Sequence, residues 1–214
     1  HNKNPNIFLK NLIKLMDNNS YLVIENAYSF DNFKKLEFDQ IYNEHMFYYS
    51  LTTINYLFSK HNLNLIDVKF NTTHGGSVCF VGSFIQPEKS FNTRLNKIIL
   101  KESNFFKNFL LKKFEKLLLN KKKLFWNLLN KISYSDKVFG GYGASAKSFT
   151  AISFLELNKL NLKFIIDTTF IKLNRYIPKF EIPILSEKEL KKLKYDYIIV
   201  FSWNYLDDII RKKK

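Results

Sequence analysis

The sequence predicts an α/β protein, because helical and extended patterns alternate along the chain and the composition is that of a protein with a buried core. Hydrophobic residues make up 46% and charged residues 25% of the 214 residues, which is ordinary for globular proteins. Strands that alternate with helices favour a parallel sheet with right-handed crossovers. A chain of this length has room for one large domain or two small ones.

The first part of the chain carries two helical and three extended patterns. Apolar residues recur at helical spacing before and after a short strand, and Ser50 stands where the N-cap of the second helix is expected. The last two strands are expected to form an antiparallel pair at the edge of a sheet, with Gly75 or Gly76 supplying the positive φ of the turn between them. The predicted helices are residues 6–17 and 50–61, and the predicted strands are residues 21–26, 63–70 and 78–84.

The middle of the chain is predicted to be helical. Between residues 92 and 133, apolar side chains keep a three-to-four spacing, which is typical of amphipathic helices. The run Lys121–Lys123 is expected to mark a break between two helices. This helical stretch is interpreted as a connector between two domains.

A second α/β unit is predicted after the connector. Its first strand ends at Gly140, residues 141–147 form a turn, and a helix follows to about Leu157. Ser186 is expected to cap a later helix, with Glu189 at the capping-box position. The remaining predicted elements are strands at 162–167, 182–185 and 195–203, and a helix at the end of the chain.

The charge and the cysteine content narrow the classes of function. The formal net charge is +15, which by itself could indicate nucleic acid binding. Proteins that recognise nucleic-acid bases and phosphates usually do so through arginine side chains, however. The only arginines of this sequence are Arg94, Arg175 and Arg211. A solvated basic surface or an anionic small substrate explains the charge better.

The single Cys79 allows no internal disulfide and favours a reducing, cytoplasmic setting. No window of about 18 uncharged apolar residues indicates a membrane span. The sequence begins without Met or a signal-peptide pattern, so we interpret it as a chain that continues upstream.

The densest group of reactive side chains is Tyr42-Asn43-Glu44-His45. A histidine is the natural base for removing a proton next to a carbonyl near neutral pH. Glu44 can fix the tautomer of His45 or bind a substrate hydroxyl, and the Tyr42 hydroxyl can donate to a developing enolate oxygen. The alternative is a surface Glu-His pair beside a buried tyrosine.

Two glycine-containing turns are candidate anion sites. His74-Gly75-Gly76-Ser77 is either a simple tight turn or a turn whose backbone N–H groups bind an anion. Gly141, Gly143 and Lys147 follow a strand and open a helix, where backbone, helix N-terminus and ammonium group can meet a phosphate. Asp167 ends the next strand, where an acidic residue can bind a ribose hydroxyl. The alternative is a tight turn without a ligand.

Taken together and in order, these segments resemble the sugar C-methyltransferases that act on nucleotide-linked ketosugars, across nearly the whole chain. The resemblance is carried by Phe38–Thr52, His74–Ser77, Gly141–Lys147, Asp167, Arg175–Pro178, Ile182–Ser186 and Phe201–Asn204.

The resemblance implies a three-part enzyme with a zinc-binding N-terminal domain, a central S-adenosylmethionine domain and a Rossmann-like C-terminal domain. Residues 1–90 would then be the C-terminal half of a class I methyltransferase sheet, residues 91–133 the connector, and residues 134–214 the Rossmann-like domain.

The implied reaction is methyl transfer to C3 of a dTDP-linked 4-keto-deoxysugar through an enolate. The resemblance implies that His45 is the base and that Tyr42 and Glu44 hold the sugar. It also implies that Lys147 and Arg175 bind the diphosphate. The other expected substrate-binding residues are His74, Gly141, Gly143 and Asp167.

The chain also departs from the family pattern. The glycine-rich donor motif belongs upstream of Asn6, so we expect the S-adenosylmethionine site to lie largely outside this chain, which would then be inactive alone. The zinc domain is also expected upstream. Ser148 stands where the family pattern places glycine. Two other functions remain open: a non-catalytic basic module that binds nucleotides or nucleic acids, and a stand-alone nucleotide-sugar binder that has lost methylation.

Overall fold

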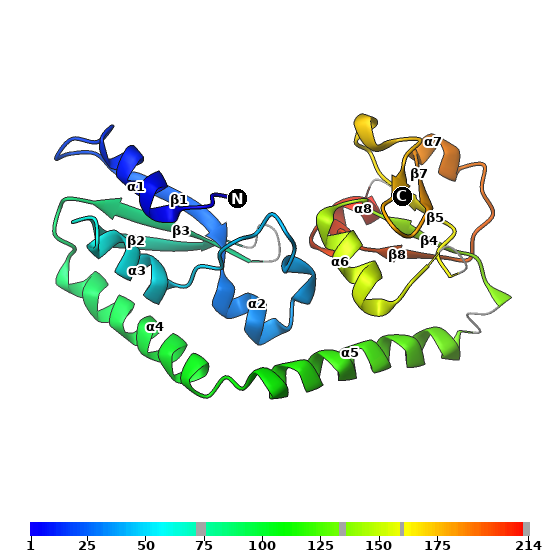
Figure 1. Cartoon of the computed structure of the whole chain (residues 1–214), viewed down its shortest axis with the longest axis horizontal. Coiled ribbons are helices and arrows are strands. Elements are labelled where there is room, and N and C mark those ends of the chain that lie inside the picture. The colour runs from blue at the N-terminus through cyan, green and yellow to red at the C-terminus, as the bar shows by residue number, and fades with distance from the viewer. Residues whose placement is uncertain (72–75, 133–135, 159–160, 212–214) are drawn as a thin grey trace. The chain divides into compact units, whose positions relative to one another are not determined.

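The structure is a computed structural model, and it describes residues 1–71, 76–132, 136–158 and 161–211. The chain forms two compact units (Figure 1). Unit 1 comprises residues 1–37 and 43–114, and unit 2 comprises residues 38–42 and 115–214. Five residues from the first half of the sequence therefore fold with the second half.

Unit 1 is built on a three-stranded antiparallel sheet with the strand order β1-β3-β2. Leu22 in β1 lies opposite Gly82 in β3, and β2 is bulged between Leu65 and Asp67. The antiparallel pair of β2 and β3 is confirmed, and Gly76 has the predicted positive φ, at 138°. The strands are β1 (Leu22–Ala27), β2 (Asn64–Asn71) and β3 (Ser77–Ser83).

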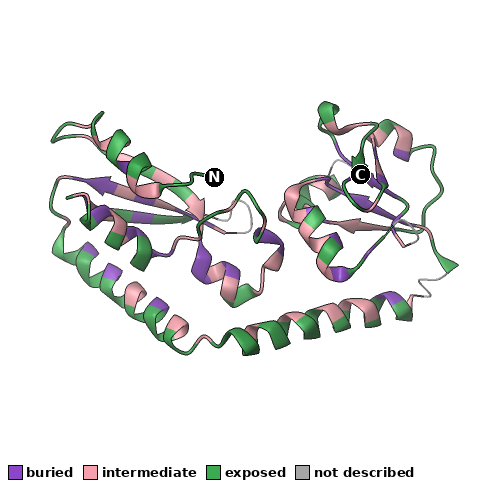
Figure 2. Ribbon diagram, in the orientation of Figure 1, coloured by how far each residue is buried: buried purple, intermediate pink, exposed green. Residues whose placement is uncertain are grey.

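The helices of unit 1 pack against the sheet around one apolar core. Ser50 caps α3 through a capping box with Thr53, as its position predicted, and Asn4 caps α1. Leu9 from α1, Phe58 from α3 and Phe80 from β3 are fully buried in this core, and Figure 2 shows the buried positions along the strands and α3. The helices are α1 (Pro5–Ile13), α2 (Ser29–Lys35), α3 (Leu51–Ser59) and α4 (Lys89–Lys107).

The stretch predicted to be a helical connector contains two helices, but the predicted break at Lys121–Lys123 is wrong. These lysines lie inside α5 (Leu111–Lys131), which is consistent with the good helix propensity of lysine. The chain leaves the helical path at Asn108 instead, where the side-chain amide donates to the Asn104 carbonyl at 2.8 Å. Asparagine competes for backbone partners in this way and favours helix ends.

Unit 2 contains a five-stranded sheet with the order β6-β7-β5-β4-β8. The strands β7, β5, β4 and β8 are parallel, and β6 is an antiparallel edge. The predicted α/β class and parallel sheet are thus confirmed. The strands are β4 (Phe139–Tyr142), β5 (Phe164–Ile166), β6 (Tyr176–Ile177), β7 (Ile182–Leu185) and β8 (Tyr197–Val200).

The first turn of unit 2 differs from the prediction. The strand β4 continues to Tyr142 instead of ending at Gly140, and α6 (Ala146–Leu155) begins after the N-cap Ser145. Gly140 is paired with Phe164 of β5 and Ile198 of β8, and it must be glycine because the Phe164 ring fills the space that a Cβ would need. The other elements of unit 2 are the 3-10 turns η1 (Phe38–Gln40), η4 (Phe170–Lys172) and η5 (Trp203–Tyr205) and the helices α7 (Glu187–Leu190) and α8 (Leu206–Arg211).

The capping box predicted at Ser186 and Glu189 is present and starts α7. Among the helices within the described residues, none combines the length and the apolar character that crossing a membrane requires.

Candidate functional site

A pocket of about 570 Å³ lies at the carboxyl ends of the parallel strands of unit 2. In this sheet β5 pairs with one edge of β4, and β8 pairs with the opposite edge of β4. The order of the strands therefore reverses at β4, and ligands of open α/β sheets bind in the crevice at such a switch point. The pocket is lined by Tyr142, Gly143, Ser145, Asp167–Thr169, Lys172, Ser202, Tyr205, Asp208, Ile209 and Arg211.

Gly143 begins the turn that leaves β4 and forms part of the pocket wall. Its φ of 95° is strained for any residue with a side chain,. Its N–H donates to the Ile166 carbonyl at 2.7 Å, and a Cβ here would overlap the Ser202 hydroxyl oxygen. The glycine thus lets the loops after β4 and β8 approach each other closely.

Asp167 joins the turn after β4 to the loop after β5 through the two oxygens of its carboxylate. Its Oδ2 accepts from the Ala144 N–H at 2.7 Å and from the Lys172 ammonium group at 3.3 Å. Its Oδ1 accepts from the Thr169 N–H at 2.7 Å. Burial alone would raise the pKa of Asp167, but these hydrogen bonds and the Lys172 charge outweigh it and lower the pKa. Asp167 is therefore ionised and already supports the loop.

The backbone N–H groups of the turn are largely used within the protein. Ala144 donates to Asp167, and Ser145 donates to the Ser148 hydroxyl at 2.8 Å. Ser148 in turn donates its N–H to the Ser145 hydroxyl and is fully buried. This capping box explains why serine replaces the expected glycine at residue 148, and it leaves Gly143–Ser145 unable to cradle a phosphate with their N–H groups.

Tyr142, Lys172 and Arg211 are further polar side chains that line the pocket. The Tyr142 hydroxyl donates to Glu187 Oε1 at 2.5 Å. Burial, followed by this hydrogen bond, raises the pKa of Tyr142 to about 12, so the hydroxyl remains a neutral donor. The positive charges at the pocket come from Lys172 and Arg211, of which Arg211 pairs with Asp208 at 3.0 Å.

The expected phosphate residues are not all brought together. Gly143 and Asp167 line the pocket, whereas Gly141 lies within β4 against the Phe201 ring. Lys147 is on the first turn of α6, with its ammonium group 5.6 Å from the centre of the Trp203 ring. Arg175 is exposed between η4 and β6, and neither cation is among the residues that line the pocket.

Sequence reasoning missed Lys172 and Ser202, which line the pocket. Their positions in the sequence could have indicated them. Ser202 closely follows β8, and Lys172 lies six residues after β5, so both come after the carboxyl ends of parallel strands, where ligands bind.

The proposed acid–base residues lie in the loop before α3. Tyr42 is half-buried and ends the segment that folds with unit 2, while Glu44 is exposed and His45 half-buried in unit 1. The His45 ring lies 5.4 Å from that of His1 and 6.1 Å from that of Tyr48, between centroids. His74 and Gly75 lie outside the described residues.

A buried carboxylate fixes the start of α3, directly after this loop. Glu102 of α4 is 1% exposed. Its Oε1 accepts from the Leu51 N–H at 2.9 Å and the Tyr28 hydroxyl at 2.6 Å. Its Oε2 accepts from the N–H and hydroxyl of Thr52 at 2.9 and 2.5 Å. The negative charge thus satisfies the free N–H groups at a helix N-terminus.

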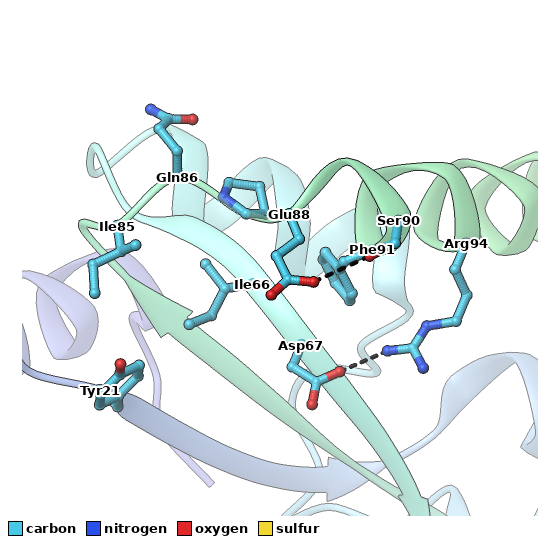
Figure 3. A pocket seen from close by; sticks show the side chains of 10 residues that line it. Tyr21, Ile66, Asp67, Ile85, Gln86, Glu88, Ser90, Phe91 and Arg94 are labelled. Carbon is cyan, nitrogen blue, oxygen red and sulfur yellow. Dashed lines mark hydrogen bonds and ion pairs between the residues drawn. The ribbon is translucent and has the colours of Figure 1, made fainter.

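Unit 1 has a pocket of its own, of about 520 Å³, between β2 and the start of α4. Figure 3 shows Arg94 reaching Asp67 and Ser90 reaching Glu88 across its rim. The Arg94–Asp67 pair is more than half exposed, so solvent screens it strongly. None of the predicted site residues lines this pocket, and it carries no functional argument.

The side chains and N–H groups of the described residues determine which cofactors they could hold. No group of three or more His, Cys, Asp or Glu side chains within them could hold a metal ion. The turn after β4, with its N–H groups already bonded, does not fit the phosphates of a dinucleotide bound along the backbone. It is likewise no glycine-rich loop for a methyl donor.

Comparison with known proteins places these features in a family. The family model described as a C-methyltransferase C-terminal domain matches residues 72–214. The chain is also 25% identical over 193 residues to the C-methyltransferase NovU of Streptomyces niveus, covering 89% of this chain and 46% of that protein. The chain therefore spans about half the length of this relative. The expected relationship is confirmed: the chain belongs to the family of C-methyltransferase C-terminal domains.

Proposed function

We propose that this chain is the C-terminal portion of an S-adenosylmethionine-dependent C-methyltransferase that acts on a nucleotide-linked 4-keto-deoxysugar in the cytoplasm. Unit 2 binds the nucleotide part of the substrate in its pocket. The observation that supports this role is the polar pocket at the switch point of a parallel sheet, in a chain that belongs to the C-methyltransferase family.

The pocket offers chemistry that suits a nucleotide diphosphate. Lys172 and Arg211 present cationic groups that are paired with Asp167 and Asp208 of the same pocket, so an anion would bind by competing with these carboxylates. Thr168, Thr169 and Ser202 supply short polar side chains around the opening. Because the turn N–H groups are occupied, anion binding here depends on side-chain cations rather than on a glycine-rich backbone cradle. Lys147 and Arg175 remain proposed diphosphate ligands on the strength of the family resemblance.

The proposed chemistry on the sugar is assigned to the loop before α3. His45 takes the proton from C3, next to the ketone, and the electron pair of the C–H bond becomes that of an enolate. The Tyr42 hydroxyl donates to the enolate oxygen, and Glu44 accepts a hydrogen bond from a sugar hydroxyl. S-adenosylmethionine, when bound to the central domain, supplies an electrophilic methyl group for this carbon.

Replacing His45 by glutamine is expected to abolish proton removal at C3, because glutamine cannot act as a base. In the intact methyltransferase, exchange of the C3 proton of dTDP-4-keto-6-deoxyglucose in D₂O, followed by NMR, is expected to slow by about 10²–10⁴-fold. This measurement does not depend on methyl transfer.

His61→Gln is the matched control. His61 lies just after α3 and contacts Asn6 at 3.2 Å, so its replacement is expected to leave the exchange rate unchanged. Normal exchange in the His45→Gln protein would show that another group is the base.

A further inference from the structure

Of the first 114 residues, only the segment Phe38–Tyr42 folds with unit 2. The segment contains the 3-10 turn η1, in which Asp39 and Gln40 are buried. It ends at Tyr42, the first residue of the proposed acid–base group. The contacts that hold this segment therefore bear directly on where that group lies.

Three contacts bind the segment to the helix α6 and the loop after β8. The Trp203 indole N–H donates to Asp39 Oδ2 at 2.8 Å. The Phe38 and Phe154 rings pack with their centroids 4.4 Å apart. The Thr150 hydroxyl lies 3.5 Å from the Ile41 carbonyl, at the upper limit of hydrogen-bond length, and is closer to the Ala146 carbonyl of its own helix, at 3.2 Å.

The indole of Trp203 joins the segment to Lys147 as well. The Lys147 ammonium group lies over one face of the ring, 5.6 Å from its centre, while the ring N–H points to the Asp39 carboxylate. An indole that donates to a carboxylate carries more negative charge on its faces, and this strengthens its attraction to a cation. Trp203 thus holds Asp39 and Lys147 in one arrangement.

We infer that Asp39 and Trp203 are positioning residues, which hold the Tyr42–His45 loop at the nucleotide-binding unit through the segment Phe38–Tyr42. This inference rests on the proposed function. His45 follows Tyr42 by three residues, so their Cα atoms are at most about 11 Å apart. Fixing Tyr42 on unit 2 therefore confines the proposed base to the vicinity of the substrate-binding unit.

Trp203→Phe tests the inference, because phenylalanine keeps an aromatic ring but cannot donate to Asp39. In the intact methyltransferase, we expect kcat for C3-proton exchange to fall about tenfold or more while KM changes less than twofold, since misplacing a catalytic group affects the rate more than binding. Asp39→Asn keeps an acceptor for the indole and is expected to retain most of the rate. Asp39→Leu is expected to lose it.

Trp126→Phe is the matched control. It removes the indole hydrogen bond from Trp126 to the Leu155 carbonyl at 3.0 Å and leaves the hydrogen bond from Trp203 to Asp39 in place. We expect exchange kinetics like those of the unaltered protein. An equal fall in kcat for both tryptophan variants would overturn the inference, because it would indicate a general loosening of unit 2.

Amide hydrogen exchange measured by mass spectrometry on the chain tests the contact without any reaction. Protection of residues 38–42 is expected to fall at least tenfold in Trp203→Phe and to persist in Trp126→Phe. Unchanged protection in Trp203→Phe would overturn the inference. A lack of C3-proton exchange in the unaltered enzyme would count against the proposed function, and the protection pattern would still decide whether Trp203 holds the segment.

Discussion

Glu102→Ala is expected to lower the free energy of unfolding of unit 1 by about 3–5 kcal/mol, because several neutral donors lose their acceptor at once and each buried donor left unsatisfied costs about 1–3 kcal/mol. The substitution leaves the N–H groups of Leu51 and Thr52 and the hydroxyl of Tyr28 without their acceptor. Burial, and then the hydrogen bond to Glu102, raise the pKa of Tyr28 far above its usual value. Tyr28 thus remains a protonated donor that needs this acceptor.

Urea unfolding followed in parallel by circular dichroism and tryptophan fluorescence measures this effect. Both tryptophans, Trp126 and Trp203, belong to unit 2, so a loss confined to unit 1 appears in the dichroism and leaves the fluorescence midpoint in place. Glu102→Gln keeps the shape and is expected to cost less. Glu115→Ala, at an exposed position, is the control and is expected to change stability by about 0.5 kcal/mol or less. A loss below about 1 kcal/mol for Glu102→Ala would contradict the assigned role.

Gly143→Ala is expected to lower the stability of unit 2 by about 2–5 kcal/mol. A side chain at φ 95° costs about 1–2 kcal/mol in backbone strain, and the overlap with Ser202 adds the cost of overpacking, about 1–3 kcal/mol. Because Gly143 and Ser202 both line the pocket, ligand binding there is expected to weaken as well. The tryptophan fluorescence transition in urea measures the loss of stability.

Two variants separate strain from overlap. Gly143→Ala combined with Ser202→Gly removes the overlap but keeps the backbone strain, so about half of the loss is expected to return. Gly76→Ala, at φ 138° with no atom nearer than 3.5 Å to the added Cβ, is expected to show the backbone cost alone. Full stability of Gly143→Ala would contradict the close approach of the two loops.

Local patterns predicted most of the elements. Hydrophobic periodicity located α1, α3 and every strand except β6 to within a few residues, but it missed β6 and the helix α2. The caps at Ser50 and Ser186 were predicted from local chemistry that the structure confirms. The break placed at Lys121–Lys123 failed because charge runs do not interrupt a helix whose residues have high helix propensity. The real break depends on the side chain of Asn108.

The site was predicted less completely, because its contacts join residues far apart in the sequence. Asp167 was predicted as a site residue from its place at the end of β5. Its hydrogen bond from the Ala144 N–H, which occupies a donor of the turn after β4, was not predicted. Glu102 binds Tyr28, 74 residues away, and Trp203 binds Asp39, 164 residues away. No periodic pattern encodes such pairs, and only the fold brings them together.

The most direct measurement is a thermal-shift titration of this chain with dTDP, S-adenosylmethionine and a mixed-sequence oligonucleotide, at low and moderate salt. A ligand that binds only the folded state adds about 2.7 kcal/mol of stability at a hundredfold excess over its dissociation constant. If unit 2 binds the nucleotide part of the substrate, dTDP is expected to stabilise the chain, and this stabilisation is expected to weaken in Gly143→Ala. Stabilisation by the oligonucleotide alone, lost as salt releases the bound counterions, would contradict it and would identify a basic nucleic-acid-binding module.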